Sequence, residues 1–492
     1  MKILLDTNIV IPAEPTAPEY MEPETPTVAS LIQLLAGTSH ESLVHPATRE
    51  ELLRDRNPTR RHMRQQLLAK YRELRRPPPV PLELTQVLGT SAPGSHDAVD
   101  LKLLAALHGD AVDLLVTHDQ RMHTWASRLG LAERVMTASE ALAALRALEP
   151  RTPAPPPAVS SVLAYELNEA DPIFTSFRQD YPQFDDWLAK CKLEHRQAWI
   201  VSGRGSEYAG IAIVNPEAHA DYGLGERVLK LCTFKVSERH RGLRIGELLL
   251  GTVLKYAFAN RFIHLYVTVL PKYTALVQLI VAFGFLESDQ RSSMGELVFV
   301  KPLDPNVDAQ AQCFSPLDYH VRYGPYHARH VGVGSFIVPI RPEYHAALFP
   351  DASPQASLFA GRSPFGNALR KAYLCHSPIR KIAAGDLLYF YASRRQRAVT
   401  VLGVAEETFT SRDPAIIARR VAKRTVYRYA EIEQLCESTV LAILFRKAWV
   451  LSQPVPWKDL AEADVLGAPP QSIVELEEKA ATWLSRHAKP LL

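Results

Sequence analysis

The sequence predicts an α/β protein of several domains: a parallel α/β/α domain first, a mixed α/β domain next, and a small β-barrel with added helices last. The 492 residues exceed what one hydrophobic core can organise. Short apolar runs alternate with helical patterns in the first third, which is typical of βαβ units. A proline-dense stretch at 150–157 and a weaker seam at 301–305 divide the chain. We therefore expect domains at 1–149, 158–304 and 311–490.

The composition is that of a globular protein. Hydrophobic residues make up 47% of the chain and charged residues 22%, and the formal net charge of +3 excludes a generally polybasic protein. The five cysteines are scattered without zinc-binding spacing, which argues against a zinc site and against a disulfide framework. No run has the length of a membrane span, and the first residues lack a signal-peptide pattern. We expect a cytoplasmic protein without a membrane partner.

Two acidic residues follow short apolar runs that are far apart in the sequence. Asp6 ends the run at 3–5, and Asp119 follows the run at 114–116. The carboxyl ends of neighbouring parallel strands form the ligand crevice of an open α/β sheet. Carboxylates gathered there repel one another unless a hard cation lies between them. This placement predicts Mg²⁺ or Mn²⁺ and hydrolysis of a phosphodiester.

Further acidic residues fit the same crevice. Asp97 and Asp100 are spaced i, i+3 at the start of a helical pattern and lie on one face of it. They either join the cation site or favour the positive end of the helix dipole. Glu50 and Glu51 lie in another helical stretch, where either side chain could simply be solvated.

This ordered series resembles the PIN-domain nucleases over about 149 residues. The matching positions are Asp6-Thr7-Asn8, an acidic residue before Leu52, the pair Asp97 and Asp100, and Thr117-His118-Asp119. The resemblance implies RNA cleavage by a metal-activated water, with Asp6, Glu51, Asp97, Asp100 and Asp119 as catalytic residues and metal ligands. Glu51 is preferred over Glu50 because of its spacing from Pro46 and the leucine that follows it.

A basic run follows this acidic cluster. Between Arg54 and Arg76 the sequence carries nine Lys and Arg residues against two acidic residues. Such a run is either a solvated helix face or a contact with the phosphate backbone of RNA, and its one-sided charge favours the contact.

The second predicted domain contains a glycine loop between a strand and a helix. The strand at 229–236 leads into the loop at 241–246, and a helical pattern follows. A glycine-containing turn that opens a helix exposes backbone N–H groups to a pyrophosphate.

At this point the sequence resembles the GNAT acetyltransferases over nearly all of 158–304. Arg241 and Gly246 match the family's Arg/Gln-x-x-Gly-x-Gly/Ala loop, and Arg244 stands where the middle glycine is usual. The resemblance implies acetyl-CoA as cofactor, bound by Phe234, Val236, Arg241, Gly242, Leu243, Arg244, Ile245 and Gly246. The position of the family's tyrosine acid holds Ile280. Tyr273 either replaces it as the catalytic donor to the CoA thiolate or is a packed surface tyrosine.

The third predicted domain resembles the ASCH/PUA-like RNA-associated barrels in its Gly385-Asp386 turn and the aromatic strand that follows. Its tyrosines at 373, 389 and 391 are either base-stacking rings beside a basic surface or core residues.

These readings give a leading hypothesis and two alternatives. The first is a metal-dependent PIN-type ribonuclease fused to an acyl-CoA-binding domain and an RNA-binding domain, as in toxin or stress-response effectors. The second is an N-acetyltransferase that acts on an RNA-linked or protein amine, with the first domain binding RNA. The third is a non-enzymatic, antitoxin-like binding module. The expected partners are RNA, with tRNA as one form, acetyl-CoA, and either a second copy of the chain or an antitoxin-like protein.

Overall fold

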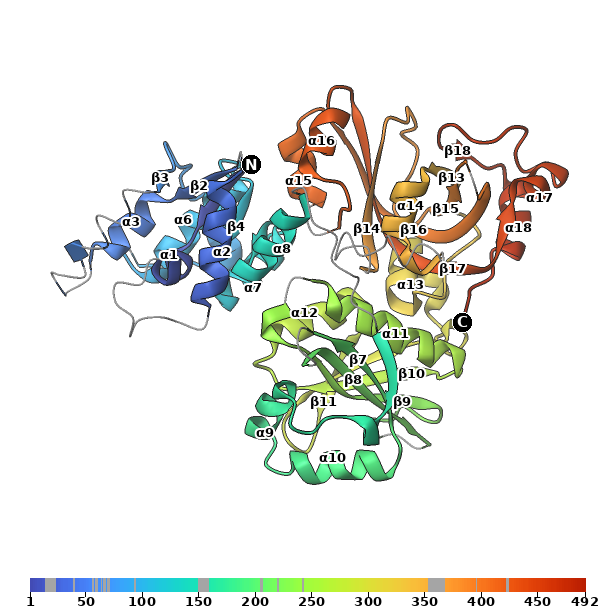
Figure 1. Ribbon diagram of the computed structural model, residues 1–492, viewed down its shortest axis with the longest axis horizontal. Coiled ribbons are helices and arrows are strands. Elements are labelled where there is room, and N and C mark those ends of the chain that lie inside the picture. Colours follow the sequence, from blue (N-terminus) through green and yellow to red (C-terminus); the bar gives the residue numbers. More distant parts are fainter. Residues whose placement is uncertain are drawn as a thin grey trace. The chain divides into compact units, whose positions relative to one another are not determined.

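The computed structural model in Figure 1 describes most of the chain. Residues outside the description are 14–23, 39, 55–56, 58–60, 63, 65–67, 69–70, 93, 149–158, 204–206, 219–220, 241–242, 353–367, 395 and 422–423. Within the described residues, no helix is both long enough and apolar enough to span a bilayer.

The chain forms two compact units. The first contains residues 1–150 together with 413–423 and 427–436, and the second contains 151–412, 424–426 and 437–492. The second unit thus includes two of the three sheets. Two helices from the predicted third domain belong to the first unit.

The first unit is built on a parallel sheet, as the sequence predicts. Its strand order is β3-β2-β1-β4-β5, and each neighbouring pair is parallel. The strands are β1 (Lys2–Leu5), β2 (Glu41–Val44), β3 (Arg72–Glu73), β4 (Leu114–Val116) and β5 (Val135–Met136). The central strands are short apolar runs because helices cover both faces of a parallel sheet.

The helices of the first unit come from two parts of the chain. The N-terminal helices are α1 (Thr7–Ala13), α2 (Thr25–Ala36), α3 (Pro46–Leu52), α5 (Leu82–Leu88), α6 (His96–His108), α7 (Gln120–Arg128) and α8 (Ala138–Leu148). Helices α15 (Pro414–Val421) and α16 (Tyr429–Leu435) join them. Arg419 of α15 forms ion pairs with Asp110 and Asp113, and Tyr429 packs edge-on against His40. These contacts place α15 and α16 near the amino ends of β2 and β4, away from the predicted acidic crevice.

The second unit begins with a mixed seven-stranded sheet in the order β11-β12-β10-β9-β8-β7-β6. The strands are β6 (Val159–Leu163), β7 (Gln197–Ser202), β8 (Tyr208–Glu217), β9 (Val228–Val236), β10 (His264–Val269), β11 (Leu286–Arg291) and β12 (Leu297–Pro302). Helices α11 (Ile245–Ala259) and α12 (Thr274–Ala282) pack on one face, and α9 (Thr175–Asp180) and α10 (Phe184–Leu193) on the other (Figure 1). Each face of this sheet therefore has its own hydrophobic core.

The C-terminal sheet of this unit has six strands in the order β14-β17-β16-β15-β13-β18. The strands are β13 (Ser335–Ile340), β14 (Arg370–Cys375), β15 (Leu387–Ala392), β16 (Ala398–Ser411), β17 (Val440–Pro456) and β18 (Val474–Glu475). Its helices are α13 (Pro316–Tyr323), α14 (Pro342–Leu348), α17 (Trp457–Glu462) and α18 (Glu478–His487).

This C-terminal sheet corrects two expectations. Its outer strands β14 and β18 lie at opposite ends of a mixed sheet, where we expected a closed small barrel. Three register shifts between β16 and β17 bend these long strands without closing the sheet. Tyr389, Tyr391 and Tyr373 are buried, so they are core residues and not a base-stacking surface.

Candidate functional site

The strongest candidate site is a wedge between two parallel strands of the seven-stranded sheet. Strands β9 and β10 pair only from Val228 and His264 to Leu231 and Val267. Yet β9 continues to Val236 and β10 to Val269. Beyond Leu231, the backbone N–H and C=O groups of β9 on the side of β10 are no longer part of the ladder between these two strands. Such an edge can accept an extended ligand in the manner of an added strand.

A β-bulge lies where the two strands separate. On the other side of β9, Val214 is opposite Leu231, whereas the preceding residue of β8, Ile213, is opposite Thr233. One extra residue, Cys232, is therefore inserted into β9. A bulge increases local twist and bends its strand, which accounts for the divergence of β9 from β10. Past the bulge, Phe234 packs on the core of α11.

The amino end of α11 meets the wedge. Gly246 lies so close to neighbouring groups that an added Cβ would be 3.1 Å from Cδ2 of Leu279 and 3.8 Å from Cγ2 of Val236. Arg244 precedes the helix in the left-handed conformation, with φ of 57°, and no side chain caps the helix. The first N–H groups of this 15-residue helix are consequently suited to an anionic group.

Most of the predicted acetyl-CoA contacts lie at this wedge. Phe234 and Val236 are on the separated part of β9, and Leu243, Arg244, Ile245 and Gly246 lead into α11. Arg241 and Gly242 lie outside the described residues. The binding role of all eight residues stays a prediction.

Tyr273 lies immediately before α12, and its hydroxyl donates a hydrogen bond to Asp180 of α9. Burial and this hydrogen bond raise the pKa of Tyr273 to about 12. Lys272 also binds Asp180. Although burial opposes ionisation of Asp180, the hydrogen bonds from Lys272 and Tyr273 lower its pKa. Tyr273 is thus a protonated phenol at neutral pH, held by a carboxylate.

Sequence reasoning missed the charged groups on the α9 side of the wedge. Lys235 Nζ donates to Ser176 Oγ over 2.5 Å and lies 5.5 Å from the ring centroid of Phe177. The available signal was a lysine between two apolar residues of the strand, Phe234 and Val236. Asp180 had no comparable signal, because its role depends on contacts with residues more than ninety positions away.

The predicted acidic residues of the first unit meet at the carboxyl end of its sheet. Asp6 is buried and accepts hydrogen bonds from Thr117 Oγ1 over 2.6 Å and from Asn8 Nδ2 over 2.8 Å. Burial raises the pKa of Asp6 to about 6, and the negative charges of Glu51 and Asp119 add to this effect. Asp6 is therefore within electrostatic reach of Glu51 and Asp119 at this end of the sheet.

Asp100 is also within electrostatic reach of Asp6, but it is engaged by an arginine. Burial raises its pKa to about 7, with further contributions from the charges of Asp6 and Asp119. Arg121 on α7 binds Asp100 at 2.8 Å and Asp97 at 2.6 Å. This arginine neutralises the two carboxylates that begin α6.

The remaining acidic residues have local partners. Glu51 accepts a 2.5 Å hydrogen bond from Thr7 Oγ1 and contacts His96, whereas Glu50 is exposed. Asp119 caps α7 by accepting hydrogen bonds from the backbone of Arg121 and the residue after it. Among the residues that the structure describes, no group of three or more His, Cys, Asp or Glu side chains is placed to hold a metal ion. The predicted metal centre is thus not found, because Arg121 and the helix cap occupy its carboxylates.

The basic run between Arg54 and Arg76 is only partly described. Arg54 donates to the carbonyl of Gly94, and Arg72 pairs with Glu41. Its contact with RNA remains a prediction.

Comparisons with known proteins concern the second unit. Residues 163–285 match the model of the Acetyltransferase (GNAT) family. No curated protein matches the chain.

Solved structures similar to parts of the chain are distant. A GNAT acetyltransferase from Staphylococcus aureus Mu50 is 15% identical, covers 30% of this chain and 100% of its own, and has a TM-score of 0.24. A GNAT acetyltransferase from Elizabethkingia anophelis, solved with acetyl-CoA bound, is 15% identical over 30% of this chain and 98% of its own, with a TM-score of 0.22. The ASCH protein of Zymomonas mobilis is 16% identical over 32% of this chain and 98% of its own, with a TM-score of 0.26.

The matching family model lies outside the first unit, and the PIN-nuclease resemblance of that unit stays a prediction. The match at 163–285 contains the bulged strand, the start of α11 and Tyr273. The central part of the chain is therefore a GNAT acetyltransferase domain.

Proposed function

We propose that the protein is an acetyl-CoA-dependent N-acetyltransferase whose cofactor site is the wedge between β9 and β10. The observation that carries the proposal is the bulge at Cys232, which opens two paired parallel strands next to the uncapped amino end of α11. This geometry lies inside the segment that matches the GNAT family.

The residues at the wedge fit acetyl-CoA. The part of β9 from Thr233 to Val236, which lies beyond its ladder with β10, suits the amide groups of a pantetheine arm. The first N–H groups of α11 suit its pyrophosphate, and Gly246 lets the amino end of α11 pack closely against Leu279. When bound, acetyl-CoA supplies an acetyl thioester to the acceptor amine.

The transfer forms a C–N bond, breaks the C–S bond, removes one proton from the amine and returns one proton to the thiolate. Tyr273 is our proposed donor to the sulfur. A phenol with a pKa of about 12 is a weaker acid than a thiol of pKa about 8.5. Once its hydroxyl turns from Asp180 to the sulfur, Tyr273 therefore stabilises the thiolate by a hydrogen bond, and the proton that completes the thiol comes from solvent.

We expect Tyr273→Phe to lower kcat about tenfold and to leave KM for acetyl-CoA unchanged, because it removes only a donor to the leaving sulfur. The measurement is CoA release with any amine that the wild-type protein acetylates. An unchanged kcat would assign Tyr273 to packing.

We expect Gly246→Val to weaken acetyl-CoA binding at least tenfold, because the new side chain crowds Leu279 and the amino end of α11. Gly467→Val is the control, since an added Cβ at Gly467 meets no atom within 4 Å. Calorimetric titration of both variants measures the effect. Equal affinities of the two variants for acetyl-CoA would show that the cofactor does not bind next to Gly246.

The test of the proposed function is transfer of a labelled acetyl group. The full chain is incubated with labelled acetyl-CoA and with small amines, peptides or aminoacyl-tRNA as acceptors. Transfer that is lost in Gly246→Val and retained in Gly467→Val supports the proposal. Absence of transfer to every acceptor, together with absence of acetyl-CoA binding, rejects it.

A second candidate function concerns the first unit. Burial first, and then the charge of Asp119, raise the pKa values of Asp6 and Asp100, and carboxylates gathered in this way are what a metal-dependent ribonuclease uses. As arranged, these residues do not fit a divalent ion, because Arg121 holds Asp97 and Asp100. We therefore derive no hydrolytic step.

We expect Mn²⁺ to bind Arg121→Ala at least tenfold more tightly than the wild-type protein, since the substitution frees two carboxylates. Calorimetric titration with MnCl₂ provides the measurement, and Arg121→Ala/Asp6→Asn is the control. Weak binding of Mn²⁺ by both variants would exclude a metal-dependent nuclease as the function of the first unit.

A further inference from the structure

The amino end of α11 is tied to the C-terminal sheet by a buried carboxylate. Glu247, in the first turn of α11, is 2% exposed. Its carboxylate accepts hydrogen bonds from Arg244 Nη1 at 2.6 Å, from Leu369 N at 2.9 Å and from Arg370 N at 3.3 Å. A carboxylate that is held by three donors fixes the position of the helix turn that carries it.

One turn after Glu247, α11 also packs closely against the residue that precedes β14. An added Cβ at Gly251 would be 3.4 Å from Cδ2 of Leu369, and Leu369 belongs to the same hydrophobic core as α11. The residue that precedes β14 is thus part of the GNAT core.

Arg370 extends this contact into a buried ionic cluster, which we call the Glu406 cluster. Glu406 binds Arg370 Nε at 3.1 Å and Arg446 Nε at 2.7 Å, and it also pairs with Arg424. Although burial opposes its ionisation, the charges of Arg424, Arg446 and Arg370 lower the pKa of Glu406 to about 2. Removing one member of a buried cluster leaves uncompensated charge, so the cluster is held as a unit.

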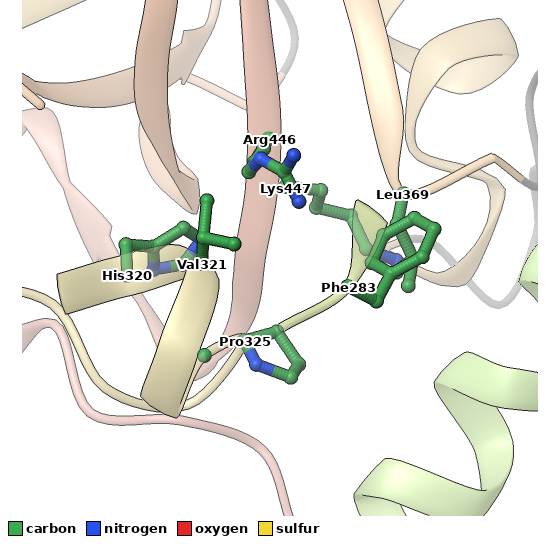
Figure 2. A pocket seen from close by; sticks show the side chains of 8 residues that line it. Phe283, His320, Val321, Pro325, Leu369, Arg446 and Lys447 are labelled. Carbon is green, nitrogen blue, oxygen red and sulfur yellow. The ribbon is translucent and has the colours of Figure 1, made fainter. Parts of the chain in front are cut away.

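The same cluster reaches the second helix at the wedge. Arg446 Nη1 donates to the carbonyl of Ala282, the last residue of α12, over 2.9 Å. Figure 2 shows Arg446 beside Phe283 and Leu369 around a small pocket. A cation at a helix carboxyl end is favoured by the helix dipole.

Lys301 of β12 adds a third connection. It is fully buried, and Nζ donates to the carbonyls of Phe283 at 2.8 Å, Val321 at 3.1 Å and Arg322 at 2.8 Å. Lys301 thereby joins the end of α12 to α13 of the C-terminal domain.

We infer that Glu406 is a positioning residue for acetyl-CoA binding, which acts by holding α11 through Arg370 and α12 through Arg446. The C-terminal sheet is then a working part of the transferase site and not a separate module. The part of this inference that concerns acetyl-CoA rests on the proposed function. The part that concerns the two helices does not.

The test compares Glu406→Gln with the wild-type full chain. Arg446→Lys is the second variant, because it keeps the charge but shortens the reach to Ala282. Leu484→Ala is the matched control, since Leu484 is fully buried in the C-terminal core and outside the cluster. Two quantities are measured: the Kd for acetyl-CoA by calorimetry, and amide hydrogen exchange without ligand at Leu248 and the next residues of α11, where the helix's own hydrogen bonds begin.

We expect Glu406→Gln to raise the Kd about tenfold and to speed exchange in α11, with Arg446→Lys showing a smaller change in the same direction. Leu484→Ala should lower the melting temperature and leave both quantities unchanged. The inference is overturned if the amides of α11 in both cluster variants exchange at the wild-type rate or at the rate measured in Leu484→Ala. If the wild-type protein binds no acetyl-CoA, the proposed function fails, and the exchange data still decide whether the cluster positions α11.

Discussion

Gly284→Ala should be among the most destabilising single substitutions in the second unit, at more than about 4 kcal/mol. Gly284 follows α12 with φ of +82°, which a residue with a Cβ adopts at a cost of about 1 kcal/mol. The larger effect comes from contact. An added Cβ would overlap the carbonyl oxygen of Val321 and lie 3.0 Å from Cα of Arg322. Because these are backbone atoms, α13 would have to move.

Gly295→Ala separates the two effects. Gly295 has φ of +77° in the turn between β11 and β12, but an added Cβ there meets no atom within 4 Å. We expect this control to lose only about 1 kcal/mol. Urea unfolding midpoints of the two variants give the comparison. Equal losses would mean that the close approach of α13 to Gly284 does not exist.

Asp6→Asn should change the pH dependence of stability by about 2.5 kcal/mol between pH 4 and pH 8. Burial raises the folded-state pKa of Asp6 from 3.8 to about 6, so the folded protein binds this proton more tightly than the unfolded chain does. The stabilisation from the neutral carboxyl is complete below about pH 4 and is lost as the pH rises through about 6. Asparagine does not titrate, so the variant lacks this loss.

The measurement is the unfolding midpoint of both proteins from pH 4 to pH 8, with a chelator present. We expect the wild-type protein to lose stability relative to Asp6→Asn as the pH rises. Parallel curves for the two proteins would show that Asp6 is not buried among the other carboxylates.

Local sequence patterns were enough to predict the parallel sheet and to bring Asp6 close to Asp119. Short apolar runs that end in Asp6 and Asp119 specify where strands stop, and the strand order then brings the two ends together. The same reasoning could not predict Arg121, because an arginine two residues after a capping aspartate resembles an ordinary solvated side chain. Its partners at 97 and 100 come from another helix.

The GNAT loop was visible in sequence, but the feature that opens the wedge was not. The bulge at Cys232 depends on how β8 and β9 pair, and nothing in the apolar pattern of β9 marks the extra residue. The hydrogen bond from Leu369 N to Glu247 could not be predicted either, since it joins residues 122 positions apart. The tyrosines of β15 were misleading because both faces of that strand are buried.

Calorimetric titration of the full chain with acetyl-CoA tests the central claim most directly. We expect one saturable site per chain, with binding weakened at least tenfold by Gly246→Val and unaffected by Gly467→Val. Absence of saturable binding, or equal binding by the wild-type protein and Gly246→Val, would contradict the assignment of the β9–β10 wedge as an acetyl-CoA site.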